Sequence, residues 1–567
     1  MTVSPSPAAP ARQAPLTIVP VGGCGEVGLN ATLFDYLGQS VLLDCGALLG
    51  VQNAPGVHKV VPGFEPVFRS DRKLSGVVLT HGHEDHIGAL SALLAERDVP
   101  IFGTPITCDL VRSRLERDAV VPSEARAQSK RLIEVEPGST FSVGPFDFEF
   151  ISVTHSVPGS VAVVMSCPAG RILHTGDFRL DLEPWKGGPT DMARLDALGA
   201  EGIDVLMSDS TNAEVPGWGR SEREVIAELE RQIAPGQGRV VVTMMGSHIH
   251  RMGALAEVAM RLDRKLCIVG RALERNWEIG VNRGLITPDP HVRIMPERMA
   301  GVPRKKVLVL ATGAQGEWNG GLSKIAGGQD GLLRLQAGER VIFSARTIPG
   351  NETTVRRVVN RFARQGVKVI GPDDAPVHTS GHARQDEQRE LLRRVRPKQF
   401  VPVYGERAML EAHARTAKDA GIEPRNIFVV EDGQTLFLEQ GQLRFGPVEE
   451  VSRRPLDGDG RVMDWGDVRD RNRISRSGLV ACSVALDRAG RLVADPVITE
   501  RGLRITPNRR LELVAAVKEA LDDPHLISRE MIENAARQAI LRGLEIGPRR
   551  GPEIEVLVVA VDRHLAS

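Results

Sequence analysis

The chain has 567 residues, of which 42% are hydrophobic and 25% charged, a composition that excludes wholesale disorder. This length predicts about two to four domains. The 72 basic and 72 acidic residues give a formal net charge of zero, so the chain as a whole has no electrostatic attraction to nucleic acid or membranes. A local basic groove remains compatible with this balance.

Other features of the sequence indicate its compartment. No apolar run approaches the roughly 18–20 residues of a membrane span. Residues 1–15 lack the pattern of a secretory signal and are typical of a disordered tail. The six cysteines show no C-x-x-C spacing, which argues against a disulfide framework or a thiolate zinc site. We therefore expect a cytoplasmic protein without membrane association.

The chain changes character several times along its length. Residues 16–215 are a succession of short β-rich runs, several of which end at a polar residue. Residues 216–373 alternate helical stretches with strands, as a doubly wound α/β domain does. Residues 374–446 return to β-like sequence around one helix. The polar, turn-rich residues 447–463 predict a linker, and residues 464–567 predict a small α+β domain of three strands and two helices that serves oligomerisation.

Two glycine-rich segments resemble nucleotide-binding loops but lack the required context. Residues 23–28 fit the pattern G-x-G-x-x-G after a strand, yet the sequence that follows alternates like another strand instead of opening a helix. Residues 311–316 lack the G-K-[ST] ending of a phosphate-binding loop. We interpret both segments as tight turns.

The strongest chemical signal is the run His81-Gly82-His83-Glu84-Asp85-His86, directly after a predicted strand at residues 75–80. Three imidazoles and two carboxylates this close together are costly to bury unless a cation neutralises them. A tight turn can aim His81 and His83 at one metal and Asp85 and His86 at a neighbouring one. A solvated histidine-rich loop is the alternative, and the position at a strand end argues against it.

Two more strand ends supply candidate ligands. His155 ends the run FDFEFISVTH, and Asp177 ends the run RILHTGD. A carboxylate such as that of Asp177 can bridge two cations at the separation of roughly 3.5–4 Å that two-metal hydrolysis uses. His174 lies inside the second run, and we assign it a structural role.

This motif, followed by a lone histidine and a lone aspartate, resembles the metallo-β-lactamase superfamily. The resemblance implies an α/β fold of αββα sandwich type with two divalent metal ions. It places His81, His83, His155 and Asp177 on the first cation, and Asp85, His86 and Asp177 on the second. Zinc is the favoured ion and manganese the alternative, because histidine and aspartate sites accept both.

A long insert separates Asp209 from the segment His378-Thr379-Ser380-Gly381-His382. This arrangement resembles the β-CASP nucleases, in which the insert clamps nucleic acid over the metals. Together with the glycine-rich start, the PGNE segment at residues 349–352 and the FVPVYGE strand, it resembles the ribonuclease J family from about residue 16 to the end. The implied fold is a metallo-β-lactamase sandwich with an inserted β-CASP domain and a small C-terminal α+β domain.

The resemblance implies a metal-dependent 5′→3′ exoribonuclease that prefers 5′-monophosphate ends, also cuts internally, and acts in mRNA decay and rRNA maturation. Asp85, Asp209 and His382 are the implied catalytic residues, and residues 378–382 the implied phosphate contacts. Ser344 and Arg346, with the turn at residues 246–248, are weaker candidates for a 5′-phosphate pocket, against plain loop roles. The implied partners are single-stranded RNA, a second copy bound through the C-terminal domain, and other RNA-decay proteins.

The chain departs from the family at Tyr404, where the family strand reads roughly FVPVHGE and its histidine is the last metal ligand. A phenol is a poor neutral ligand beside imidazole, so we expect the second cation to bind more weakly. The nearest histidine in sequence, His413, lies in the next predicted helix. An inactivating substitution and a natural variant with altered metal use both explain the change better than a degraded catalytic subunit.

Two rival functions follow from these observations. A catalytically weakened RNA-binding or scaffold subunit would explain Tyr404. A small-ester metallo-hydrolase of the glyoxalase type would share the metals, but it would not explain the insert or the segment at residues 378–382.

Overall fold

A computed structural model describes residues 14–51, 53–117, 131–328, 333–348, 350–523, 525–526, 528–545 and 551–561. The chain divides into two compact units, one of Met1–Leu49 with Val60–Arg453 and the other of Gly50–Lys59 with Arg454–Ser567. Most of the predicted tail at residues 1–15, and Pro349 of the PGNE segment, lie outside the described residues. All six cysteines are free thiols. Within the described part of the chain, no helix combines the length and hydrophobicity of a membrane span.

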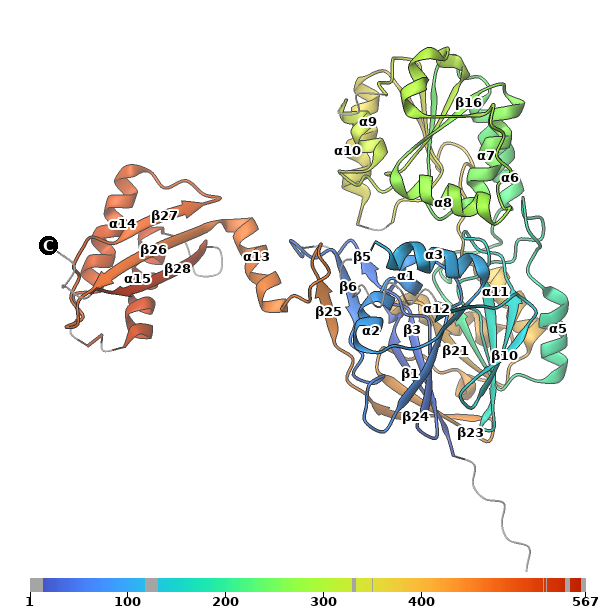
Figure 1. Cartoon of the computed structure of the whole chain (residues 1–567). Helices are drawn as coiled ribbons and strands as arrows, with labels where there is room; N and C mark the ends of the chain where they lie inside the picture. Colours follow the sequence, from blue (N-terminus) through green and yellow to red (C-terminus); the bar gives the residue numbers. More distant parts are fainter. Residues whose placement is uncertain are drawn as a thin grey trace, which may run out of the picture. The chain divides into compact units, whose positions relative to one another are not determined.

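The first unit contains a sandwich of two sheets (Figure 1). One sheet has eight strands, in the order β24 (Gln442–Val448), β23 (Gln434–Glu439), β1 (Leu16–Gly22), β3 (Ala31–Tyr36), β4 (Gln39–Leu43), β7 (Lys73–Val78), β8 (Ile101–Gly103) and β9 (Leu132–Glu134). The other has six, in the order β10 (Thr140–Val143), β11 (Phe146–Ser152), β12 (Val161–Cys167), β13 (Gly170–His174), β14 (Val205–Asp209) and β21 (Gln399–Val403).

The alternation of apolar residues along the strands builds the core between these sheets. Phe146, Phe148 and Phe150 point from one face of β11 into a cluster with Ile18 and Phe34 of the other sheet. Because successive side chains of a strand point to opposite faces, the intervening residues serve the outer layer.

Helices cover the outer faces of the sandwich. Ile151 and Leu173 pack with residues of α5 (Met192–Glu201) and α11 (Gln385–Val395). Helix α12 (Arg407–Asp419) packs beside β21. The remaining short elements of the sandwich are α1 (Glu84–Ile87), α2 (Leu90–Glu96), α3 (Pro105–Leu115), η4 (Pro424–Asn426), β5 (Leu48–Leu49), β6 (Lys59–Pro62) and the strand pair β2 (Cys24–Gly25) with β22 (Gly405–Glu406).

The insert is a doubly wound domain with a parallel six-stranded sheet. Its strand order is β17 (Arg293–Ile294), β16 (Lys265–Val269), β18 (Val307–Ala311), β15 (Val240–Thr243), β19 (Arg340–Phe343) and β20 (Lys368–Ile370). Helices cover both of its faces (Figure 1), and they are α6 (Glu222–Ile233), α7 (Ile249–Arg261), α8 (Arg271–Asn282), α9 (Gly321–Gly327) and α10 (Glu352–Arg364). Two 3-10 turns, η2 (Pro296–Gly301) and η3 (Arg304–Lys306), precede β18.

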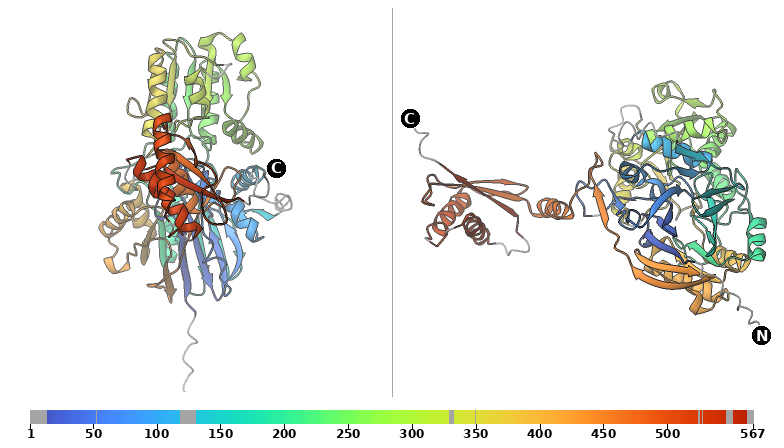
Figure 2. Two further views of the ribbon diagram at one scale, coloured as in Figure 1. Left: turned by 90° about the vertical axis from the view of Figure 1, so that its left-hand side faces the viewer. Right: turned by 60° about the horizontal axis from the view of Figure 1, so that its bottom comes forward.

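The second unit is an α+β domain. Its three-stranded sheet has the order β27 (Val497–Arg501), β26 (Leu479–Leu486) and β28 (Glu553–Ala560). Helices α14 (Pro507–Ala520) and α15 (Arg529–Gly543) pack on one face of this sheet, as the right view of Figure 2 shows. Its apolar core includes Val480, Leu513 and Ile540.

The predicted fold class is therefore confirmed, and the structure contains two elements that the sequence did not predict. Residues 453–456 of the predicted linker form strand β25 (Arg453–Leu456). Helix α13 (Trp465–Ser477) precedes the first predicted strand of the C-terminal domain. Because Val468 is its one buried residue, α13 lacks the apolar stripe by which a helix is recognised in sequence.

Candidate metal centre

The polar residues singled out in the sequence collect at one edge of the sandwich. Strands β13, β14 and β21 are parallel neighbours, so their carboxyl ends lie on the same edge. Asp177 follows β13, Asp209 ends β14 and Tyr404 follows β21. The turn with His81 follows β7 of the facing sheet, and His155 follows β11. These separate strand ends therefore converge at one edge of the sandwich.

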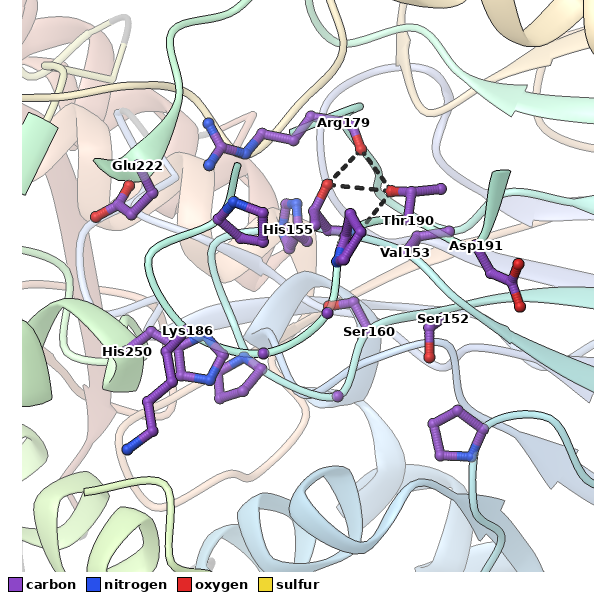
Figure 3. Close-up of a pocket in the computed structure, with 18 of the residues that line it drawn as sticks. Ser152, Val153, His155, Ser160, Arg179, Lys186, Thr190, Asp191, Glu222 and His250 are labelled. Atoms are coloured by element: carbon purple, nitrogen blue, oxygen red, sulfur yellow. Dashed lines mark hydrogen bonds between the residues drawn. The ribbon is translucent and has the colours of Figure 1, made fainter. Parts of the chain in front are cut away.

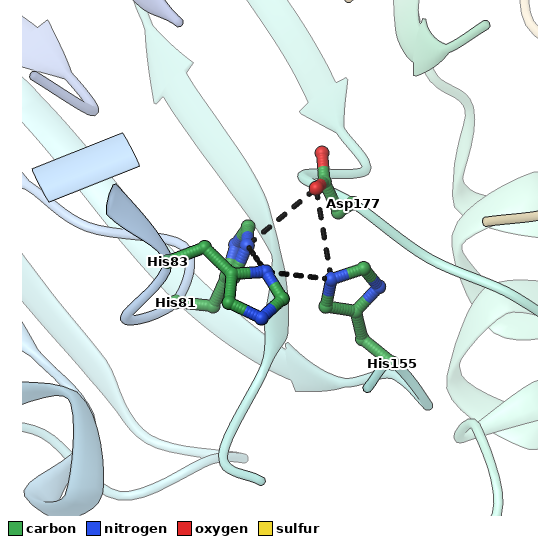
Figure 4. Close-up of side chains that lie close together, drawn as sticks. All are labelled: His81, His83, His155 and Asp177. Atoms are coloured by element: carbon green, nitrogen blue, oxygen red, sulfur yellow. Dashed lines mark hydrogen bonds and ion pairs between the residues drawn. The ribbon is translucent and has the colours of Figure 1, made fainter. Parts of the chain in front are cut away.

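Three imidazoles and one carboxylate form the first group (Figure 4). The Nδ1 atom of His83 lies 3.1 Å from Nε2 of His81 and 3.0 Å from Nε2 of His155. Oδ2 of Asp177 lies 3.5 Å from Nε2 of His81 and 3.6 Å from Nε2 of His155. All four potential ligand atoms lie within 4.8 Å of one another.

The outer nitrogens of these rings are held by hydrogen-bond partners. His155 donates from Nδ1 to the carbonyl oxygen of Gly381 at 2.6 Å, so its Nε2 presents a lone pair to the group. Thr80 Oγ1 lies 3.0 Å from Nδ1 of His81, and Ser247 Oγ lies 3.0 Å from Nε2 of His83. Such outer contacts orient imidazole ligands in metal sites.

The electrostatics of the first group suit a cation. Burial, and next to it the neighbouring imidazoles, lower the pKa values of His81 and His155 well below the usual range. Burial also lowers the pKa of His83 to about 4. The rings are therefore neutral near pH 7, which is the form that binds metal. Three neutral imidazoles and a carboxylate are a donor set that fits a divalent cation.

A second group shares Asp177 and adds Asp85 and His86. Nε2 of His86 lies 3.2 Å from Oδ1 of Asp177 and 3.7 Å from Oδ2 of Asp85. The other ring nitrogen of His86 lies 2.8 Å from Oδ2 of Asp44, a buried carboxylate that follows β4. Sequence reasoning missed Asp44, although it ends a strand as the predicted ligands do.

Tyr404 occupies the position of the expected histidine, and its side chain contacts a carboxylate of the site. The residue is 2% exposed, and its hydroxyl donates to Oδ2 of Asp44 at 3.1 Å. Burial, followed by the carboxylates of Asp44 and Asp177, raises the pKa of Tyr404 well above its usual range, so the phenol stays protonated. Tyr404 therefore supports the carboxylate that orients His86.

No nearby histidine takes over the missing position among the described residues. His413 lies in α12 and is buried, with Nδ1 3.0 Å from Ser210 Oγ. His174 is buried at the end of β13, where its Nδ1 accepts from the backbone N–H of Gly176 at 3.0 Å. Neither ring belongs to a group of potential metal ligands.

The predicted catalytic pair is formed. Nδ1 of His382 lies 2.8 Å from Oδ2 of Asp209 and 3.8 Å from Oδ2 of Asp177. Burial acts to lower the pKa of His382, but the carboxylates of Asp209 and Asp177 outweigh it and raise the pKa to about 9. Asp209 is itself oriented by the backbone N–H of Thr211 at 2.9 Å and the Thr211 hydroxyl at 2.7 Å.

The segment at residues 378–382 lies directly against the first group. A Cβ atom on Gly381 would sit 2.6 Å from Cε1 of His155, so only glycine permits this approach. Ser380 Oγ accepts from the side-chain amide of Asn212 at 2.8 Å, and the Thr379 hydroxyl donates to the carbonyl of Arg220 at 3.0 Å. The segment is thereby held between the sandwich and the start of the insert.

A buried ion pair connects the insert to this segment. Arg251 of α7 is 1% exposed and forms two hydrogen bonds to Glu222 of α6, at 2.6 and 2.7 Å. It also reaches Ser344 Oγ at 3.1 Å and Nδ1 of His378 at 3.4 Å. Arg346, by contrast, is exposed, and its backbone carbonyl accepts from the side chain of Gln315 at 2.9 Å. The ion pair is invisible in sequence because its partners are far apart along the chain.

A cavity of about 640 Å³ opens beside His155 (Figure 3). Its lining comes from the sandwich and from the insert, and it includes His155, Arg179, Trp185, Lys186, His248 and His250. The amine of Lys186 donates to the carbonyl of Leu285 at 2.7 Å. The cavity thus combines the basic side chains of Arg179 and Lys186 with the acidic side chains of Asp191 and Glu222, beside one potential ligand of the first group.

Fold and site together define a metallo-hydrolase of the metallo-β-lactamase superfamily with a β-CASP insert. Family models match in four segments: "Metallo-beta-lactamase superfamily" at residues 25–214, "Ribonuclease J, beta-CASP domain" at 237–362, "Zn-dependent metallo-hydrolase RNA specificity domain" at 375–429 and "Ribonuclease J C-terminal domain" at 466–561. The chain belongs to the ribonuclease J family of metal-dependent ribonucleases, as the sequence motifs predicted.

Several relatives share the full length of the chain. Ribonuclease J 1 of Streptococcus pyogenes serotype M3 is 33% identical over 96% of this chain and 97% of that protein. Ribonuclease J of Mycobacterium tuberculosis is 33% identical over 99% of this chain and 100% of that protein. A crystal structure of a protein of unknown function from Enterococcus faecalis V583 matches with a TM-score of 0.53 at 15% identity, over 75% of this chain and 100% of that chain, and shows the fold alone.

Proposed function

We propose that this protein is a 5′→3′ exoribonuclease that prefers RNA with a 5′-monophosphate and also cuts internally, acting in mRNA decay and rRNA maturation. The observation that carries the proposal is the adjacency of two features at one edge of the sandwich. The groups of potential metal ligands lie there, and so does a cavity lined from both the sandwich and the insert. A small-ester hydrolase has no use for the second feature.

The potential ligands divide between two cations as the family resemblance implies. His81, His83, His155 and Asp177 hold the first, for which a set rich in imidazole favours zinc. Asp85 and His86, together with Asp177, would hold the second. Divalent cations at such a site polarise the scissile phosphate and acidify water at neutral pH.

The residues of the chain supply the remaining chemistry. His382, protonated through its contact with Asp209, donates a hydrogen bond to the scissile phosphate or a proton to the leaving oxygen. Asp85 positions the attacking water. The Ser/Thr/Gly-rich residues 378–382 offer hydroxyl and backbone N–H donors to the RNA backbone. Ser344 lies near this segment, because Arg251 contacts both Ser344 Oγ and Nδ1 of His378. The exposed Arg346 adds a cation for the 5′-phosphate.

We expect the purified chain, supplied with Zn²⁺ or Mn²⁺, to release mononucleotides from the 5′ end of a 5′-monophosphorylated oligoribonucleotide. A 5′-hydroxyl version of the same oligonucleotide should be degraded more slowly, because it lacks the terminal charge that the pocket binds. Product ladders on 5′- and 3′-labelled RNA measure the direction. Shortening from the 3′ end, or turnover of a thioester without cleavage of RNA, would contradict the proposal.

The substitution Tyr404→His is expected to raise nuclease turnover and the occupancy of the second cation. The backbone at Tyr404 has φ = 57°, a left-handed conformation in which histidine is tolerated better than most residues. An added ligand is expected to tighten second-cation binding by about 10-fold or more, since even outer-sphere partners of a metal are worth roughly 10–100-fold. Mass spectrometry of bound metal and initial rates test this.

Equal turnover and equal metal content in parent and variant, both measured at limiting metal, would refute the assignment of position 404. Retention of RNA without cleavage in both forms would instead identify the chain as a scaffold subunit.

Other features are proposed on the resemblance and on composition. The sandwich comprises residues 16–215 and 374–446, the β-CASP domain residues 216–373, the linker residues 447–463 and the C-terminal domain residues 464–567. The C-terminal domain joins two copies into a homodimer. The protein acts in the cytoplasm on single-stranded RNA, alongside other RNA-decay proteins.

A further inference from the structure

The side chain of Asn30 lies within the second group of potential ligands. Its amide nitrogen is 2.8 Å from Nε2 of His86 and 3.3 Å from Oδ2 of Asp85. Asn30 is 3% exposed, and its Oδ1 atom accepts no hydrogen bond from the residues that the structure describes. A buried amide oxygen without a donor is unfavourable, because it has lost its hydrogen bonds to water and gained none within the protein.

The spacing of these atoms is close to that of ligand atoms around one ion. Ligand atoms about 2.1 Å from one ion lie roughly 3.0–3.4 Å apart in octahedral or tetrahedral geometry. The amide of Asn30, His86 Nε2, Asp85 Oδ2 and Asp177 Oδ1 are linked by separations of 2.8, 3.2, 3.3 and 3.7 Å. A half-turn of the amide about its Cβ–Cγ bond exchanges the nitrogen and the oxygen and leaves these separations nearly unchanged.

The backbone holds Asn30 in this place independently of its side chain. The N–H of Asn30 donates to the carbonyl of Asp85 at 3.0 Å, and its own carbonyl accepts from Gly46 N–H at 3.0 Å. A Cβ atom on Gly46 would sit 1.6 Å from the carbonyl oxygen of Asp85, so glycine is required for this close approach. Asn30 is therefore fastened to the same turn that carries Asp85 and His86.

The Tyr404 hydroxyl is already committed elsewhere, since it donates to Asp44. We propose that the amide oxygen of Asn30 is the fourth protein ligand of the second cation, in place of the histidine that Tyr404 replaces. The resulting set of two carboxylates, one amide oxygen and one imidazole is richer in oxygen than the first group. Carboxylate and carbonyl oxygens suit Mn²⁺ and Mg²⁺, so the second position should accept Mn²⁺ more readily than the imidazole-rich first group does. This inference deepens the proposed two-metal function.

Metal titration of the full chain tests the inference without any RNA. After removal of metal with a chelator, the parent is expected to bind two Mn²⁺ per chain, and Asn30→Ala to lose the second by about 10-fold or more in affinity, the size of effect that metal-site contacts commonly have. Asn30→Asp keeps an oxygen at the same position and is expected to bind both ions at least as tightly as the parent. Electron paramagnetic resonance of bound Mn²⁺ and mass spectrometry give the stoichiometry.

Three control variants sharpen the result. Gln365→Ala removes a side-chain amide that donates to the backbone of Ala326 in the insert, and it should bind both ions as the parent does. Tyr404→Phe removes the hydrogen bond to Asp44 but no ligand, so it should weaken binding of the second ion by less than Asn30→Ala does. The double variant Asn30→Ala with Tyr404→His should recover the second ion, since it restores a fourth ligand. Thermal unfolding in chelator checks that each variant is folded.

The proposal is overturned if Asn30→Ala binds two Mn²⁺ as tightly as the parent, if the parent binds only one, or if Tyr404→Phe weakens binding of the second ion as much as Asn30→Ala does. A parent that binds two ions with the expected dependence on Asn30, yet cleaves no RNA, would contradict the proposed function and leave this ligand assignment intact.

Discussion

Replacing Asp177 by asparagine is expected to abolish RNA hydrolysis and to remove both cations. One carboxylate oxygen of Asp177 lies within 3.6 Å of His81 and His155, and the other lies 3.2 Å from His86. No other residue of the described chain belongs to all three groups of potential ligands. Removing an outer-sphere partner of a metal commonly lowers metal affinity or activity roughly 10–100-fold. Removing this shared carboxylate should therefore lower the rate of RNA hydrolysis by more than about 100-fold.

Metal content by mass spectrometry and RNA turnover at saturating metal measure the effect. Asp204→Asn is a matched control, because Asp204 accepts from the backbone of Arg171 and pairs with Lys398 before β14 begins, at the end opposite Asp209. It should change stability alone. If the Asp177 variant retained two cations per chain and more than a tenth of the parental rate, Asp177 would not be a ligand shared by the two cations.

Removal of His382 is expected to lower turnover by about 10²–10⁴-fold, the contribution usual for a positioned acid or base. The substitution His382→Gln deletes the ring that contacts Asp209 at 2.8 Å. Metal content should stay at the parental value, because His382 lies outside the two principal ligand sets. Single-turnover kinetics separate this effect on the chemical step from an effect on RNA binding.

A double-mutant cycle then tests whether His382 and Asp209 act as a unit. Asp209→Asn removes the charge that keeps His382 protonated, so the double variant should be about as slow as either single variant. Multiplicative losses would show that the two residues act independently. Loss of a cation in His382→Gln would instead assign the ring to the group formed by Asp177, Asp209 and His382.

The ligand groups could be predicted from sequence because they obey a simple geometric rule. Polar residues that follow parallel neighbouring strands meet at one sheet edge, and Asp177, Asp209 and Tyr404 follow that rule. The doubly wound insert could also be predicted from the sequence, since its strands and helices alternate with clear periodicity. The turn from His81 to His86 could be predicted as a metal-binding segment from the spacing of its own histidines and carboxylates.

The residues that complete the site follow no such rule. Asn30 and Asp44 contact His86 through loops whose approach depends on Gly46, a relation that exists only in three dimensions. Glu222 begins helix α6 and Arg251 lies in helix α7, and strand β15 separates the two helices in the chain. Each residue alone resembles an ordinary surface charge of an amphipathic helix. Sequence periodicity reports which face is buried but not which buried polar groups find each other.

The hydroxyl of Ser247 has a consequence for how the enzyme responds to its own substrate. It belongs to the insert, yet it lies 3.0 Å from His83 in the first ligand group. Free-energy coupling between two binding events is reciprocal. A strand of RNA that strengthens this contact must therefore raise cation affinity by the same factor by which the cation raises RNA affinity. Through this contact, a shift of the inserted lobe on RNA binding would change cation affinity.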